Sequence, residues 1–272
     1  TLHKGNRFQI ARVQRESKMD QRIGAQFYTL REYTRTIADF EETCRKIRDI
    51  GYQIVQISGT PLGAAEMKEV LDQYGLEVVT THRSFDDFQN NLEEIMDYNR
   101  TLGCELCGIG SMPGWARESG ENLGRFLKEA GQIAARLRKE GLCFGYHNHA
   151  FEFAKVDGTY IMDRLLRETD SDTFRFIADT YWLQVGGMDP AAFLKKLGSR
   201  VMAVHFKDLK VNTDNTTEMA EVGQGNLDWE AITRVCEETG VKWALVEQDI
   251  CKRDPFASMK MSYEYLVGKG FC

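Results

Sequence analysis

Residues 133–149, IAARLRKEGLCFGYHNH, decide the fold. The stretch begins in a segment whose apolar side chains recur every three or four residues from Leu123 to Leu137, which is typical of a helix that covers a sheet with one face. Gly141 follows, at the position where a helix ends with a positive φ and favours glycine. A β-rich run, 142–149, comes next. The stretch therefore predicts a helix, a tight reversal and a strand.

The same succession of strand and helix recurs eight times from residue 21 onward, at about 26 residues per unit. The predicted strands are 22–28, 52–58, 76–82, 104–110, 142–149, 174–179, 201–207 and 242–248. Such alternation predicts a parallel sheet, and eight units match a single (β/α)8 TIM barrel over residues 19–272. The alternative is a doubly wound open sheet. It would carry a phosphate-binding glycine turn after its first strand, where this chain reads QFYTLREY (26–33).

Residues 1–18 differ from the rest of the chain, because they hold five basic residues against one acidic residue. Met19 follows, and the first regular pattern begins directly after it. We therefore expect Met19 to be the natural start and residues 1–18 to be an upstream extension that is not part of the fold. A basic targeting peptide is the alternative, which the short length and weak apolarity of the segment disfavour.

Composition narrows the classes of function. The chain has 272 residues and a net charge of −6, and a mildly acidic surface argues against a nucleic-acid partner. No apolar run approaches the roughly 18 residues of a membrane span. The seven cysteines are an odd number without a visible secretory signal, so we expect reduced thiols and a cytoplasmic location. The longest irregular stretch, 208–228, is a candidate lid over the carboxyl ends of the strands.

The carboxyl ends of the predicted strands carry the candidate site, because barrel enzymes place their chemistry there. Four of the five histidines lie at or near these ends. Glu152, Asp179, His205 and Glu247 follow four successive strands, so they are expected on one rim. Three carboxylates brought together repel one another unless a cation neutralises them. The set predicts one divalent metal, Mn²⁺ first, with Mg²⁺, Co²⁺ or Zn²⁺ as alternatives. An acid–lysine network through Lys207 is the other interpretation.

Several segments resemble a known superfamily. GYHNHAFEF (145–153), IADTYWLQVGG (177–187), VHFKD (204–208), EVGQGNLDW (221–229) and VEQD (246–249) are similar to signature segments of the xylose-isomerase-like sugar phosphate isomerase/epimerase superfamily. The resemblance extends from about residue 24 to about residue 265 and implies a barrel that holds a divalent metal.

By motif match, the resemblance implies that the metal ligands are Glu152, Asp179, His205 and Glu247. The fifth predicted strand departs from the commonest pattern, because His147 stands where many relatives have the first glutamate. His147 and His149 therefore stay open as replacements for Glu152. The histidine pair resembles the branch that contains inosose dehydratases and keto-glycoside lyases.

A dication flanked by acid and base groups suits removal of a proton next to a carbonyl, since the metal stabilises the enediolate that forms. The first hypothesis is a sugar or cyclitol isomerase or epimerase in which Glu152 and Glu247 carry the proton. The alternative is a lyase or dehydratase acting on a keto-sugar, inosose or 3-keto-glycoside, with His147 as the base. The residues expected to bind this small carbohydrate are His82, His149, Trp182 and Lys207. The sequence leaves the oligomeric state open, and a homo-oligomer is the one assembly considered, because barrels commonly self-associate.

Overall fold

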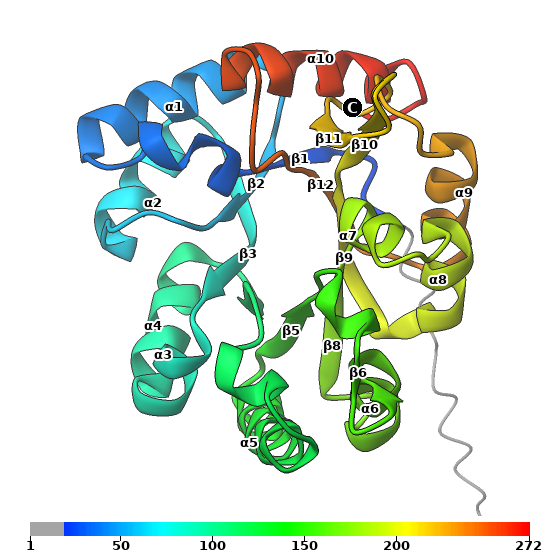
Figure 1. Ribbon diagram of the computed structural model, residues 1–272. Coiled ribbons are helices and arrows are strands. Elements are labelled where there is room, and N and C mark those ends of the chain that lie inside the picture. The colour runs from blue at the N-terminus through cyan, green and yellow to red at the C-terminus, as the bar shows by residue number, and fades with distance from the viewer. Residues whose placement is uncertain (1–18) are drawn as a thin grey trace, which may run out of the picture.

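The computed structural model describes residues 19–272, and the prediction that 1–18 lie outside the fold concerns residues beyond this range. Eight parallel strands close into a barrel, with β1 paired to both β2 and β12 (Figure 1). The barrel strands are β1 (Ile23–Gln26), β2 (Ile54–Ile57), β3 (Glu77–Arg83), β4 (Leu106–Ile109), β5 (Cys143–His147), β8 (Phe174–Asp179), β9 (Val201–Phe206) and β12 (Trp243–Val246). Each lies within or overlaps one of the eight predicted strands. The predicted (β/α)8 barrel is confirmed.

Helices surround the barrel on all sides in Figure 1. They are α1 (Ile37–Ile50), α2 (Ala64–Gln73), α3 (Phe85–Asn90), α4 (Leu92–Leu102), α5 (Gly120–Lys139), α6 (Ile161–Glu168), α7 (Thr180–Val185), α8 (Pro190–Leu197), α9 (Trp229–Thr239) and α10 (Pro255–Val267). Short 3₁₀ turns are η1 (Phe27–Tyr33), η2 (Gly114–Arg117), η3 (Phe151–Phe153) and η4 (Gly198–Arg200). The helix that decided the fold, α5, is capped by Ser119, whose hydroxyl accepts from the Asn122 amide. Gly141 has a φ of 77°, as its place after the helix requires.

Apolar side chains fill the inside of the barrel and separate its two ends. They come from six of the strands: Ile54, Val79, Leu106, Ile177, Ala203, Trp243 and Leu245. A larger apolar layer lies between the strands and the helices. Because the middle of the barrel is packed, polar side chains gather at the carboxyl ends of the strands, where the connecting loops enclose a cavity.

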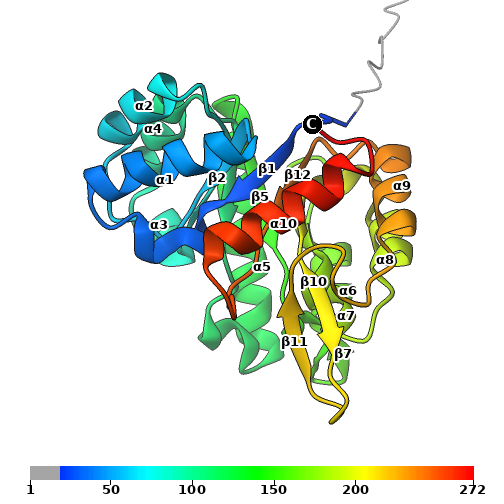
Figure 2. The same ribbon diagram turned by 90° about the horizontal axis from the view of Figure 1, so that it is seen from above.

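The stretch 208–228 is not irregular, so that prediction was wrong. It contains the antiparallel strands β10 (Asp208–Val211) and β11 (Thr217–Ala220), which project from one end of the barrel in Figure 2. The buried Asp208 carboxylate orders the rest, because it accepts hydrogen bonds from the Gly223 amide at 2.9 Å and from Trp229 Nε1 at 2.7 Å. A second small hairpin is formed by β6 (Lys155–Val156) and β7 (Thr159–Tyr160).

The sequence also led us to expect reduced thiols and no membrane span. All seven cysteines are free thiols. Within residues 19–272, no helix combines the length and the apolar character needed to cross a bilayer.

Candidate metal centre

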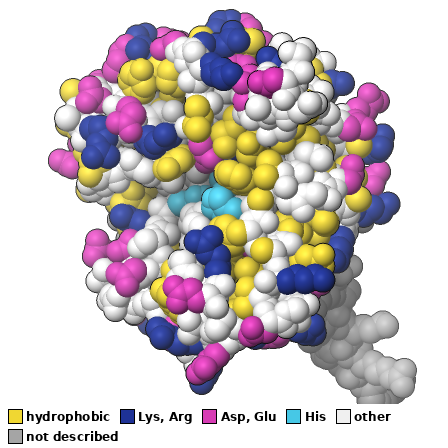
Figure 3. All heavy atoms as spheres, in the orientation of Figure 1, with side chains coloured by type: hydrophobic (Ala, Val, Ile, Leu, Met, Phe, Trp, Pro, Cys, Tyr) yellow, Lys and Arg dark blue, Asp and Glu magenta, His cyan; other side chains and the backbone are white. Residues whose placement is uncertain are grey.

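A cavity of about 640 Å³ opens at the carboxyl ends of the barrel strands. Its lining comes from the loops after β1, β2, β3 and β4 and from the ends of β5, β9 and β12. Histidine side chains lie in a hollow in the middle of this face (Figure 3). No residue of the expected lid, 208–228, lines the cavity. The site is therefore formed by the strand ends and the shorter loops.

Four buried side chains converge below this cavity. His147 ends β5, Asp179 ends β8, His205 lies in β9 and Glu247 follows β12. One ligand atom from each lies within 4.8 Å of those from the other three. His205 Nδ1 is 2.9 Å from Glu247 Oε2, and His147 Nε2 is 3.3 Å from Asp179 Oδ2. Such a set of two imidazoles and two carboxylates can hold a divalent cation.

Hydrogen bonds from outside the group orient both imidazoles. His205 Nε2 lies 2.7 Å from Gln56 Oε1, and His147 Nδ1 lies 3.0 Å from the carbonyl oxygen of Gly110. Both partners only accept, so each of these ring nitrogens carries the proton. When the rings are neutral, the opposite nitrogens present lone pairs to the carboxylates. The buried His205 Nδ1 has no hydrogen-bond partner. Lone pairs and carboxylates that face one another at these distances fit a cation between them.

The charge balance of the site also fits a dication. The buried Lys207 ammonium lies 2.8 Å from Asp249 Oδ2, 3.3 Å from Glu247 Oε2 and 3.4 Å from Asp179 Oδ2. Burial by itself would lower the pKa of Lys207, but these carboxylates raise it well above its ordinary value. Three ionised carboxylates against one ammonium leave two negative charges uncompensated. An acid–lysine network alone does not neutralise the site, whereas a divalent ion does.

Glu152 does not join this group. Its carboxylate is buried outside the cavity, where it accepts from the Tyr146 hydroxyl at 2.7 Å and from the His149 amide at 2.8 Å. Burial raises the pKa of Glu152 to about 8. The 3₁₀ turn η3 directs the side chain there, and the group of four contains His147 instead.

A second layer of polar side chains lies one pleat beyond the ligand-type residues. His149, Lys207 and Asp249 each follow such a residue by two positions, so they point to the same side and line the cavity. Asp249 was not among the residues predicted from the sequence, although its position two residues after Glu247 is the signal that identifies it. Burial raises the pKa of Asp249, and the charge of Glu247 raises it further.

The remaining predicted substrate residues lie around His147. The His82 ring, at the end of β3, is centred 5.2 Å from His147, and its buried Nε2 has no hydrogen-bond partner. Burial lowers the pKa of His82 well below its ordinary value and that of His149 to about 3, so both rings stay neutral. Trp182 supports the site from behind, because its ring packs against His149 at 5.3 Å.

A closed parallel barrel with a buried group of histidines and acids at its carboxyl rim has the architecture of a barrel enzyme. The chain belongs to the xylose isomerase-like TIM barrel family, whose model matches residues 44–258. It is 29% identical over 268 residues to an inosose dehydratase of Lacticaseibacillus casei, an alignment that covers 84% of this chain and 88% of that protein.

Solved structures show the same fold. A sugar phosphate isomerase/epimerase from Parabacteroides distasonis superposes with a TM-score of 0.77 at 22% identity, over 92% of this chain and 93% of the other. A xylose isomerase-like TIM barrel protein from Mycobacterium smegmatis, in complex with magnesium, superposes with a TM-score of 0.68 at 14% identity, over 91% and 95% of the two chains.

Proposed function

We propose that this protein is a metal-dependent carbon–oxygen lyase. It removes the proton next to the carbonyl of a keto-carbohydrate and eliminates the oxygen substituent on the following carbon. The observation that carries the proposal is the composition of the cavity floor: His147 joins the ligand group and Glu152 is held away from the cavity. The similarity to an inosose dehydratase supports the same class of reaction.

An isomerase or epimerase is the alternative. An epimerase needs a second group that returns the proton from the opposite face, whereas an isomerase returns the proton to the neighbouring carbon. The sequence hypothesis gives this task to Glu152 and Glu247 as an opposed pair. Both Glu152 oxygens, however, accept hydrogen bonds from the protein, and Glu152 does not line the cavity. Glu247 and Asp249, the two acids that line the cavity beside the histidines, both follow β12. This arrangement favours removal of a proton over its return from the opposite face.

In this proposal His147, Asp179, His205 and Glu247 are the metal ligands. The chemistry that a dication supplies there is polarisation of a carbonyl and stabilisation of the negative charge on its oxygen. Two imidazoles with two carboxylates suit Mn²⁺, and Co²⁺ or Zn²⁺ are the nearest alternatives. Since His147 is a ligand here, its use as the base is not part of the proposal.

Asp249 is the base that we assign. Its carboxylate lines the cavity, and Lys207 holds it at 2.8 Å, so it is placed to accept a proton from a substrate. The carbon–hydrogen bond breaks toward Asp249, the electron pair of that bond forms the carbon–carbon double bond, and the carbon–oxygen bond breaks. The proton taken up by Asp249 passes to the departing oxygen, which leaves as water or an alcohol, and the Asp249 carboxylate is restored. The neutral rings of His82 and His149 donate hydrogen bonds to the carbonyl and the departing oxygen, as a neutral imidazole can.

Incubation with Mn²⁺ in D₂O tests the reaction. Pools of inososes, keto-sugars and 3-keto-glycosides are followed by NMR and mass spectrometry. We expect loss of water or of an alcohol, with Asp249→Asn slowed by roughly 100-fold or more. Asp97→Asn, an exposed surface carboxylate, serves as the matched control and should react at the wild-type rate. Deuterium incorporation into a product of otherwise unchanged formula would overturn the lyase in favour of an isomerase or epimerase.

A further inference from the structure

A second cavity lies apart from the catalytic one, between the β10–β11 hairpin and the loop that follows β12. Its volume of about 230 Å³ equals the space of roughly seven or eight water molecules at about 30 Å³ each. Within residues 19–272 no residue lines both cavities, and seven of the nine residues that line this one are charged or polar. The cavity therefore has room for a small polar molecule, and we call it the hairpin cavity.

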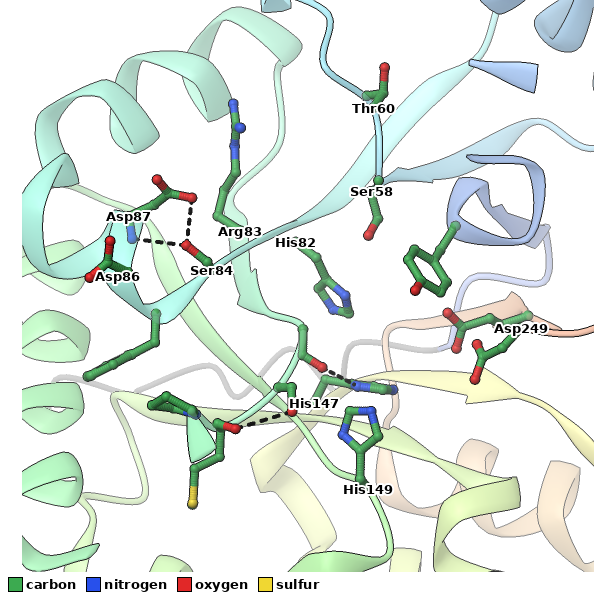
Figure 4. A pocket seen from close by; sticks show the side chains of 18 of the residues that line it. Ser58, Thr60, His82, Arg83, Ser84, Asp86, Asp87, His147, His149 and Asp249 are labelled. Atoms are coloured by element: carbon green, nitrogen blue, oxygen red, sulfur yellow. Dashed lines mark hydrogen bonds between the residues drawn. The ribbon is translucent and has the colours of Figure 1, made fainter. Parts of the chain in front are cut away.

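Gln248 faces the hairpin cavity from a segment that also carries part of the catalytic site. Its neighbours Glu247 and Asp249 line the catalytic cavity, where Figure 4 shows Asp249, whereas Gln248 lines the hairpin cavity. Gln248 is 3% exposed. Its Nε2 donates to the Ile250 carbonyl at 3.1 Å, but its buried Oε1 accepts no hydrogen bond from residues 19–272. Buried polar groups are normally paired, so this oxygen lacks a donor that a hydroxyl group in the cavity would supply.

The charged side chains of the hairpin cavity carry one surplus positive charge, since three cations stand against two carboxylates. The ammonium groups of Lys210 and Lys252 share the Glu218 carboxylate, which lies 3.5 Å from Lys210 Nζ and in contact with Lys252 Nζ. Arg253 Nε lies 3.0 Å from Glu221 Oε1. Each carboxylate is thus already paired, while the ammonium and guanidinium groups have more N–H donors than these ion pairs use. Such donors, with a surplus positive charge, attract an anion.

From the cavity, the unpaired amide oxygen and the surplus charge, we infer that the hairpin cavity is a second ligand site and that it binds a small hydroxycarboxylate. The carboxylate of the ligand contacts Lys252 and Arg253, and one of its hydroxyls donates to Gln248 Oε1. A neutral polyol would meet only the amide oxygen, and a simple carboxylate would meet only the cations. An ammonium group in place of the hydroxyl would bring a fourth cation beside the other three. The site lies outside the catalytic cavity and does not depend on the proposed reaction.

Calorimetric titration of the Mn²⁺-loaded full chain with D-gluconate, D-glucitol and hexanoate tests the site. The three compounds share a six-carbon chain, but glucitol lacks the carboxylate and hexanoate lacks the hydroxyls. We expect gluconate to bind at least tenfold more tightly than either. The double variant Lys252→Met/Arg253→Met should weaken gluconate binding at least tenfold and keep the wild-type melting temperature, because 70% and 53% of these side chains are exposed. Gln248→Met, which removes the amide oxygen but keeps the cations, should weaken it at least threefold. Lys196→Met, at an exposed lysine on α8 that is paired with Asp163, is the matched control.

Four outcomes would overturn the inference. Absence of saturable gluconate binding would leave the cavity without this ligand. Equal affinity for gluconate and hexanoate would reduce the site to an unselective attraction of anions, and an equal loss in Lys196→Met would reduce the effect to net charge. Gluconate binding that persists in the double variant would belong to the metal centre, because the oxygens of gluconate can also coordinate a dication there.

Discussion

Replacing Gln56 by Met should weaken metal binding without removing any ligand. Gln56 Oε1 accepts the His205 Nε2 proton at 2.7 Å and so leaves His205 Nδ1 free. Without this acceptor, the proton can move to Nδ1 and be donated to Glu247 Oε2, 2.9 Å away. A metal must then displace that proton and leave a buried Nε2–H without a partner.

The size of the effect follows from that buried donor. An unsatisfied buried N–H costs about 1–3 kcal/mol, which corresponds to a loss of affinity of about 5–150-fold. This agrees with the roughly 10–100-fold usually lost when a group that orients a metal-bound histidine is removed. Competition between the protein and a fluorescent Mn²⁺ chelator measures the affinity directly.

Two control variants test whether the loss of metal affinity comes from the missing hydrogen-bond acceptor. Gln26 is the register partner of Gln56 on β1 and equally buried, but its Oε1 accepts from the Tyr28 amide. Gln26→Met should therefore keep nearly full affinity, and Gln56→Glu should do so because it retains an acceptor. Unchanged affinity in Gln56→Met, or an equal loss in Gln26→Met, would refute the assignment of the His205 proton and with it the role of Nδ1 as a ligand.

Other substitutions test the ligand set and the charges. His147→Asn should weaken Mn²⁺ binding roughly 100-fold or more, whereas Glu152→Gln should keep it within about threefold; equal losses would return Glu152 to the ligand set. Burial raises the pKa of Glu152 from 4.5 to about 8, so the folded state keeps a proton that the unfolded chain releases. The free energy of unfolding should therefore fall between about pH 4.5 and 8, by at most about 1.4 kcal/mol per pH unit. Urea unfolding of the metal-free protein should show this slope reduced in Glu152→Gln, and an identical slope would contradict the burial argument. Lys207→Met should lower the melting temperature more in EDTA than in Mn²⁺, because the carboxylates lose their cation; equal decreases would argue against the charge balance.

The fold was predictable because its signals are local. Strand runs, helical periodicity and glycines such as Gly141 recur in every unit, and each needs only a short window of sequence. Asp179, His205 and Glu247 lie together as their spacing predicts, since parallel strands bring their carboxyl ends to one rim. That these three bind a metal stays a prediction.

Features that depend on distant contacts were not predictable. Glu152 is close in sequence to His147, but the turn η3 and the buried Tyr146 hydroxyl decide where its carboxylate lies.

The hairpin β10–β11, by contrast, left a local signal in the sequence. Asn215 lies between its two strands with a φ of 67°, a conformation that asparagine accepts more readily than most residues. The polar composition of 208–228 obscured it.

The period of two at the strand ends connects the metal centre to specificity. At the carboxyl ends of β5, β9 and β12 lie the ligand-type residues His147, His205 and Glu247. Two positions later follow His149, Lys207 and Asp249, which face the cavity. The metal ligands form an inner layer, and the second layer of polar side chains lies outside it. The inner layer can stay fixed for a metal while the second layer changes with the reaction, because each position is a separate side chain on the same rigid strand end. In this chain the second layer holds one carboxylate (Asp249), one ammonium (Lys207) and one neutral imidazole (His149), which together can accept a proton and assist a departing oxygen. A barrel with a second opposed carboxylate in that layer would return the proton instead, and the same metal centre would then serve an epimerase.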